Sequence, residues 1–219
     1  MKYELLQDCT LFSGIESTQI PSILACLDAR EKNYPKDDYI LQAGTRVLHV
    51  GVVVEGCINL IQEDYWGNRI LIEQVYSGGV FGEAFACAEV EKIPVSVVAA
   101  KDTTVLFLDY QRIIKVCSSA CVFHLQLIKN MVNSIAQKNV ALTHKIEHTS
   151  KRSIQDKVLA YFSTQAIQSG SASFKIPFSR QELADYLSVD RASLSRSLGL
   201  MKSEGLIDLQ GKNVKLLNE

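Results

Sequence analysis

The segment between residues 178 and 207 constrains the fold most, because it has the pattern of two short helices joined by a tight turn. Ser179 and Glu182 have the spacing of a capping box at the start of the first helix. Asp190 is a good N-cap for the second, and Gly205 is well placed to end it in a left-handed conformation. Apolar residues recur at helical spacing in both: Leu183, Ala184, Leu187, Leu194, Leu198 and Met201. The pattern predicts a helix-turn-helix.

The second of these helices carries two arginines on the side away from its apolar stripe. An arginine can bind guanine O6 and N7 with two hydrogen bonds, so we expect Arg191 and Arg196 to read bases in the DNA major groove. The small Ala192 and Ser195 let the helix approach the base edges, and we expect Ser193 to hold a phosphate. The alternative is a pair of amphipathic surface helices whose arginines are merely solvated. Cap, turn, apolar spacing and arginines all agree with DNA binding, which favours it.

Residues 206–217 have the pattern of strand, turn and strand, which predicts a wing after the recognition helix. Lys212 at its tip is placed to meet a phosphate. Residues 174–178 look like a short strand that pairs into the same small sheet. Before them, residues 153–168 read as one helix whose buried stripe is Ile154, Val158, Leu159, Phe162 and Ile167.

Length and charge agree with a two-part protein that binds nucleic acid. The 219 residues allow one large domain or two modest ones. The net charge is −1, but residues 150–219 hold ten Lys and Arg against seven Asp and Glu, a modest basic excess where phosphates are expected. The sequence has neither an apolar run of about 18 residues nor the apolar stretch of a signal peptide. We therefore expect a cytoplasmic protein with no membrane partner.

The stretch from Asp38 to Leu108 is rich in short β-branched and aromatic runs separated by glycines or polar residues. Such runs at close spacing suggest a β-sandwich or barrel. We expect Gly44, Gly56 and Gly79 to be corners that need a positive φ or a close backbone approach.

The glycine-rich segment 78–85 is the part of this half best suited to a ligand. A glycine-rich turn that leads into a short helix offers backbone N–H groups to an anion, and Glu83 can accept from hydroxyls. The alternative is a structural turn in which Glu83 caps the helix. The candidate effector-binding residues are Gly79, Phe81, Gly82, Glu83 and Ala84.

The chain turns helical from Gln111 to about Glu147, with apolar residues alternating at four and three positions. This heptad seam predicts a dimer, and a single polar Asn139 within it is a usual device for fixing register and a two-stranded state. The alternative is a core helix packed on its own domain. The seam consists of Leu125, Ile128, Val132, Ile135, Asn139, Leu142 and Ile146.

Histidines and cysteines are the remaining candidates for chemistry. His144 and His148 are four residues apart, which is compatible with a metal, but no third ligand is visible and we expect them to interact favourably with the helix dipole. Six scattered cysteines form no CxxC motif and are expected to be buried small hydrophobes. Cys117 and Cys121 could share a helix face, but a cluster there needs two more ligands. We expect neither a metal site nor a catalytic site.

Taken together, these parts resemble the cyclic-AMP receptor protein and fumarate–nitrate reductase regulator (CRP/FNR) family over nearly the full length. The resemblance is carried by Gly44 and Gly56, by Phe81-Gly82-Glu83, by Arg180-Gln181-Glu182-Leu183-Ala184, by the recognition-helix residues and by the terminal Glu-Gly-Leu-Ile. It implies an α+β protein with an N-terminal β-roll (a cupin-like double-stranded jelly roll) over residues 1–110. A dimerisation helix over 111–148 and a winged helix-turn-helix over 149–219 would follow.

The resemblance also implies the site residues and partners. Family members contact bases from the positions of Arg191, Ala192, Ser195 and Arg196, and we place Ser179 and Arg180 at the same DNA surface. The implied partners are palindromic double-stranded DNA, a second copy of the chain and RNA polymerase.

Three departures from the family pattern bear on function. Ala192 stands where a glutamate commonly accepts from cytosine N4, which leaves the usual half-site sequence in doubt, and Ser188 replaces the customary turn glycine. Ile93-Pro94 falls where members that bind cyclic AMP have an Arg-Ser pair for the cyclic phosphate. Burying a phosphate without its arginine is costly. We therefore expect an effector other than cyclic AMP.

The sequence leads to the hypothesis of a bacterial, homodimeric transcription regulator controlled by an unidentified small molecule, with no certain cofactor. Cys9 alone does not supply the clustered cysteines of the iron–sulfur branch. The alternative left open is a redox- or metal-responsive sensor that uses cysteines or histidines. Enzymatic motifs are missing from the sequence, so we do not expect an enzyme.

Overall fold

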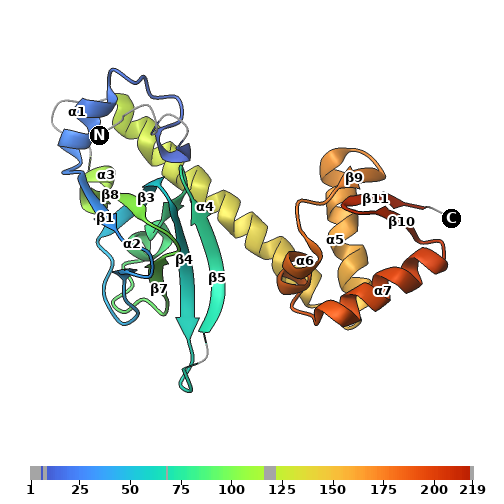
Figure 1. The fold of residues 1–219 in the computed structure, drawn as a ribbon. Coiled ribbons are helices and arrows are strands. Elements are labelled where there is room, and N and C mark those ends of the chain that lie inside the picture. The colour runs from blue at the N-terminus through green and yellow to red at the C-terminus, as the bar shows by residue number, and fades with distance from the viewer. Residues whose placement is uncertain (1–5, 7–8, 68, 116–121, 218–219) are drawn as a thin grey trace. The chain divides into compact units, whose positions relative to one another are not determined.

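The structure is a computed structural model that describes residues 6, 9–67, 69–115 and 122–217 (Figure 1). The chain forms two compact units, residues 1–137 and 138–219, and each is described by itself. Their division falls inside a long helix rather than at either boundary expected from the sequence. None of the helices in the described residues is long and apolar enough to cross a membrane.

The first unit is built on two four-stranded antiparallel sheets. One has the order β1-β8-β3-β6: Arg30–Tyr34, Thr103–Asp109, His49–Glu55 and Val80–Phe81. The other has the order β2-β7-β4-β5: Tyr39–Leu41, Ser96–Ala99, Cys57–Glu63 and Arg69–Tyr76. The β-rich pattern of the sequence is confirmed as a fold, although β1 and β6 were not expected as strands because one is polar and the other has only two residues.

Strand β3 is buried on both faces, which explains its nearly continuous valine run. Val53 packs between the two sheets with Ile58, Val97 and Val105. Val52, on the opposite face of β3, belongs to the hydrophobic cluster that includes the helical residues Ile23 and Leu127. These two layers make the first unit a sheet sandwich with one face covered by helices.

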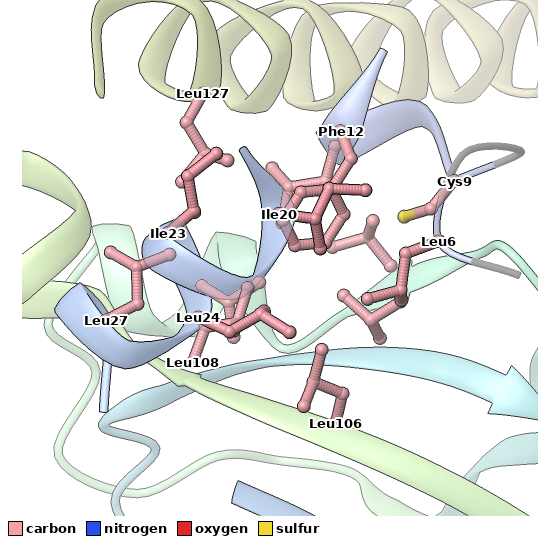
Figure 2. Packing of buried hydrophobic residues seen from close by; sticks show 14 of the residues in the cluster. Leu6, Cys9, Phe12, Ile20, Ile23, Leu24, Leu27, Leu106, Leu108 and Leu127 are labelled. Atoms are coloured by element: carbon pink, nitrogen blue, oxygen red, sulfur yellow. The ribbon is translucent and has the colours of Figure 1, made fainter. Parts of the chain in front are cut away.

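The helical layer consists of α1 (Ile20–Cys26), a 3₁₀ turn (Thr10–Phe12) and the first half of α4 (Val122–Thr149). Figure 2 shows Ile23 of α1 lying between Leu127 of α4 and the β8 residues Leu106 and Leu108. The short helices α2 (Glu83–Cys87) and α3 (Tyr110–Ile114) complete the unit.

The expected start of the long helix at Gln111 is wrong. Tyr110–Ile114 is a separate helix that Asp109 caps, and the backbone at Lys115 is already extended. The suggestion that Cys117 and Cys121 share a helix face concerns residues outside those that the structure describes.

The second unit combines α5 (Ile154–Ser169), α6 (Arg180–Leu187) and α7 (Arg191–Ser203) with a small antiparallel sheet. The sheet has the order β10-β11-β9: Ile207–Gln210, Asn213–Leu216 and Ser173–Lys175. Its core includes Val158, Phe162, Leu194 and Met201. Ile167, expected in the buried stripe of α5, is instead 78 % exposed.

Candidate DNA-binding surface and effector region

Side-chain caps fix the start of both helices of the helix-turn-helix. The Ser179 hydroxyl accepts from the Glu182 backbone N–H, and the Glu182 carboxylate accepts from the Ser179 N–H, so the expected capping box is confirmed. These bonds to Ser179 lower the pKa of Glu182. At α7, Asp190 accepts from the Ser193 N–H at 2.8 Å, which lowers the pKa of Asp190. Both helices are therefore held by charged caps at neutral pH.

The exposed face of α7 is the one expected to meet DNA. Arg191, Ala192, Ser195 and Arg196 are exposed, whereas Leu194, Leu198 and Met201 are buried. The Arg196 Nη2 donates to Ser193 Oγ at 3.1 Å, which orients the guanidinium along the helix. Helix packing thus leaves two arginines and two small residues on one outward surface, the arrangement that base reading needs.

Gly199, one turn beyond Ser195 and Arg196, extends this surface and was missed from the sequence. It is exposed, and an added Cβ there would meet nothing within 4 Å. Gly199 is four residues after Ser195 and three after Arg196, and this helical spacing could have placed it on the same face from the sequence.

The other residues predicted to contact DNA have partners within the domain, and two of them link the wing to the segment at the start of α6. Lys212 at the wing tip donates from Nζ to the Pro177 carbonyl at 2.6 Å. Arg180 donates from Nη2 to the Gly211 carbonyl at 3.4 Å, and burial lowers its pKa. Ser193 uses its backbone N–H in the Asp190 cap. These three residues have structural partners, and their contact with phosphates stays a prediction.

Ser188 at the turn has a left-handed backbone, with φ 52° and ψ 56°. This conformation suits glycine, because the Cβ of an L-residue crowds the following carbonyl. The departure from the family turn glycine is therefore a local cost in backbone energy, and the turn geometry itself is retained.

In the effector region, Glu83 is buried at 1 % exposure, at the first position of α2. The N-cap residue of α2 is Gly82, with φ 78°, so Glu83 is the first residue of the helix and does not occupy the N-cap position. Phe81 ends β6 and is buried between the two sheets, whereas Glu83 begins α2 two residues later.

Ile93 stands where the phosphate-binding arginine of cyclic-AMP-binding members would fall, and it is buried at 1 % exposure. Its side chain packs with Val47 and Ala86, and Leu41 and Phe85 lie against this cluster. The environment of Ile93 is therefore apolar, where the resemblance would place a cationic side chain that binds the phosphate.

One side of α4 packs against the first unit while another is exposed in the single chain. Leu127 and Met131 are buried in the core, and Ile128 and Ile135 pack partly against it. The other five seam residues are exposed: Leu125, Val132, Asn139, Leu142 and Ile146. The core interpretation is confirmed for the face that includes Ile128 and Ile135, and the dimer seam stays a prediction for the exposed residues.

The end of α4 is tied to α5 and α6 through His148, which is 1 % exposed. Its Nδ1 lies 3.0 Å from the Tyr186 hydroxyl and its Nε2 lies 2.9 Å from Thr164 Oγ1. Thr164 donates to the Ala160 carbonyl, so its hydroxyl accepts from Nε2–H and Tyr186 donates to Nδ1. Burial lowers the pKa of His148, in keeping with this neutral ring, and raises the pKa of the neighbouring Tyr161 to about 12.

Three of the four described cysteines do not have the environment of reactive thiols. Burial raises the pKa of Cys9, Cys57 and Cys87, which keeps them protonated at neutral pH. Cys26 lies 3.9 Å from His124 Nε2. A thiol redox sensor needs a lowered pKa, so these residues do not favour that alternative.

Two family models match the chain, one over each unit. A model described as a cyclic nucleotide-binding domain matches residues 31–120, and one described as a Crp-like helix-turn-helix domain matches residues 156–219. The curated protein "Probable transcriptional regulator flp" of Lacticaseibacillus casei is 25 % identical over 198 residues, which cover 89 % of this chain and 87 % of that one.

Solved structures share the fold at low sequence identity. CLP of Xanthomonas campestris, described as a c-di-GMP-responsive global regulator, is 18 % identical with a TM-score of 0.59, over 93 % of this chain and all of that one. CprK in complex with OCPA is 12 % identical with a TM-score of 0.66, over 91 % of each chain.

Proposed function

The chain belongs to the CRP/FNR family of transcriptional regulators, with an effector-binding and a DNA-binding domain, and we propose that it acts as a homodimer on a palindromic operator. The observation that carries the proposal is the outward face of α7, where Arg191, Ala192, Ser195 and Arg196 are exposed above a packed core. Base contacts from these side chains would specify sequence. Lys212 and Arg180 would add phosphate contacts at the wing.

The exposed seam of α4 supports the homodimer. Leu125, Val132, Leu142 and Ile146 are each more than half exposed in the single chain, and a matching helix is the partner that heptad spacing fits. A two-fold dimer would present two recognition helices to half-sites about 34–36 Å apart. Because the target is DNA, we place the protein in the cytoplasm, with RNA polymerase as a further partner. The function we propose involves no catalysis.

We further propose that the effector is a small molecule or anion other than cyclic AMP, bound in the roll near Gly79, Phe81, Gly82, Glu83 and Ala84. The buried Ile93 supports this, because an apolar cluster offers no charge to a cyclic phosphate. The fold does not specify the ligand, since CLP and CprK are described with chemically different ones.

Selection from random duplexes tests the DNA proposal. The purified protein should enrich an inverted repeat at moderate, fixed salt, and no enrichment with or without cell extract would count against it. Thermal-shift screening of metabolites and cyclic nucleotides, on wild type and Glu83→Gln, tests the effector proposal. A stabiliser that loses its effect in Glu83→Gln supports the roll site. A clear shift with cyclic AMP would refute the argument from Ile93.

A further inference from the structure

We propose that the end of α4 carries a binding site for a divalent transition-metal cation, formed by His144, Glu147 and His148. Residues spaced by three and four lie on one face of a helix. Each of these residues offers one ligand atom, and the three atoms lie within 4.8 Å of one another. The sequence-based expectation of no third ligand is therefore wrong, because Glu147 supplies it. All three residues belong to the second unit.

The donor set suits zinc and its neighbours in the first transition row. Two imidazoles and one carboxylate are a set that zinc takes when it keeps a fourth position open. Neutral imidazole binds Zn, Cu, Fe and Ni, whereas Mg and Ca prefer oxygen donors alone. The site is therefore expected to select against the hard cations.

His144 and Glu147 are already close, with Nδ1 3.7 Å from the carboxylate Oε2. This is longer than a hydrogen bond, and His144 Nδ1 has no hydrogen-bond partner in the ranges that the structure describes. The two side chains are 38 % and 54 % exposed, so both can adjust around an ion. The rings of His144 and His148 are stacked at 13°, which directs both along the same side of the helix.

His148 needs to give up only one of its two hydroxyl contacts to become a ligand. A metal-binding histidine ordinarily keeps a hydrogen bond on its other ring nitrogen, which orients the ring. Tyr186 and Thr164 each hold one nitrogen of His148, so whichever contact remains can serve that purpose.

A surface cavity of about 600 Å³ adjoins two of the donors, His144 and Glu147, and leaves room for water or a further ligand on the ion. His144, Glu147 and Thr164 line it, together with Asp156 and Lys151. The Asp156 carboxylate adds favourable charge for a cation, whereas the Lys151 ammonium opposes it.

The test is calorimetric titration of the full-length protein with ZnCl₂ at pH 7.5, for wild type, His144→Gln and Glu147→Gln. We expect one site per chain whose affinity falls at least tenfold in each variant and is unchanged in His49→Gln, a control in the first unit. Because the altered side chains are partly exposed, the variants should keep the wild-type circular dichroism and melting temperature. No binding at millimolar zinc, or equal affinity in all four proteins, would overturn the proposal.

Two further readouts separate this site from the cysteines and do not depend on the variants. The Co²⁺ complex should lack thiolate charge-transfer bands, and the metal should shift the imidazole proton signals of two of the four histidines. Thiolate bands or unshifted histidine signals would each contradict it.

Discussion

Replacing Arg196 by alanine should relax the base preference at one position in each half-site while leaving the fold intact. The side chain is exposed and donates to Ser193 Oγ at 3.1 Å, so the stability change should stay within about 0.5 kcal/mol. An arginine that reads guanine contributes about 1–3 kcal/mol of base discrimination. Two copies on one operator double the loss to about 2–6 kcal/mol, or roughly 30-fold to 25,000-fold in affinity.

Fluorescence anisotropy with a selected duplex, at one salt concentration, measures this loss. Lys202→Ala is the matched control, because it also removes one exposed cation from α7. Lys202 pairs with Asp208 Oδ1 at 3.2 Å and is not among the residues expected to contact bases. We expect Lys202→Ala to keep the base preference and Arg196→Ala to lose it at one position in each half-site. Equal weakening of all duplexes by both variants would mean that Arg196 only neutralises phosphates.

Three further changes test other parts of the account. Asn139→Leu should alter the oligomeric state or helix register rather than unfold the protein, so an unchanged dimer mass and unchanged spin-label distances across the seam would refute its register role. Ser188→Gly should raise the free energy of unfolding by up to about 1 kcal/mol, because it removes left-handed strain, and a lower denaturation midpoint would contradict this. The folded pKa of His148 lies below its ordinary value of about 6.5, so the unfolded chain takes up the proton first as the pH falls. Its contribution to stability is therefore complete above about pH 6.5 and is lost as the pH falls through the folded pKa, which the melting temperature between pH 7.5 and 5 should show. His148→Gln should flatten that dependence, and a melting temperature that rises on acidification would exclude it.

The helix-turn-helix could be predicted from the sequence because its signals are local. Ser179, Glu182, Asp190 and Gly205 act within a few residues of themselves, and each has the predicted role in the structure. The strands of the first unit were also recognisable, since β-branched runs are continuous where both faces are buried.

Features that depend on tertiary contacts were harder to predict. Helical spacing placed Ile167 in the stripe of α5, but the residue lies beyond the part of the helix that the core covers. The role of His148 was missed because its partners, Thr164 and Tyr186, are 16 and 38 residues away. Glu147, by contrast, was detectable from its spacing to His144.

The effector region illustrates the same limit. The sequence indicated Glu83 as an acceptor for hydroxyls or a helix cap, and the structure shows that its side chain is buried at the first position of α2. Burial of Ile93 depends on Val47 and Ala86, which approach it only through the roll. Its mismatch with the family arginine was visible in the sequence, but its packing was not.

The most direct test of the account compares the affinity of the full-length protein for a selected palindrome with that for the same duplex after one half-site is scrambled. At fixed salt, the account predicts two chains on the intact duplex and a large loss of affinity when either half-site is destroyed. Equal affinity for both duplexes, or one chain per duplex, would contradict reading by paired recognition helices.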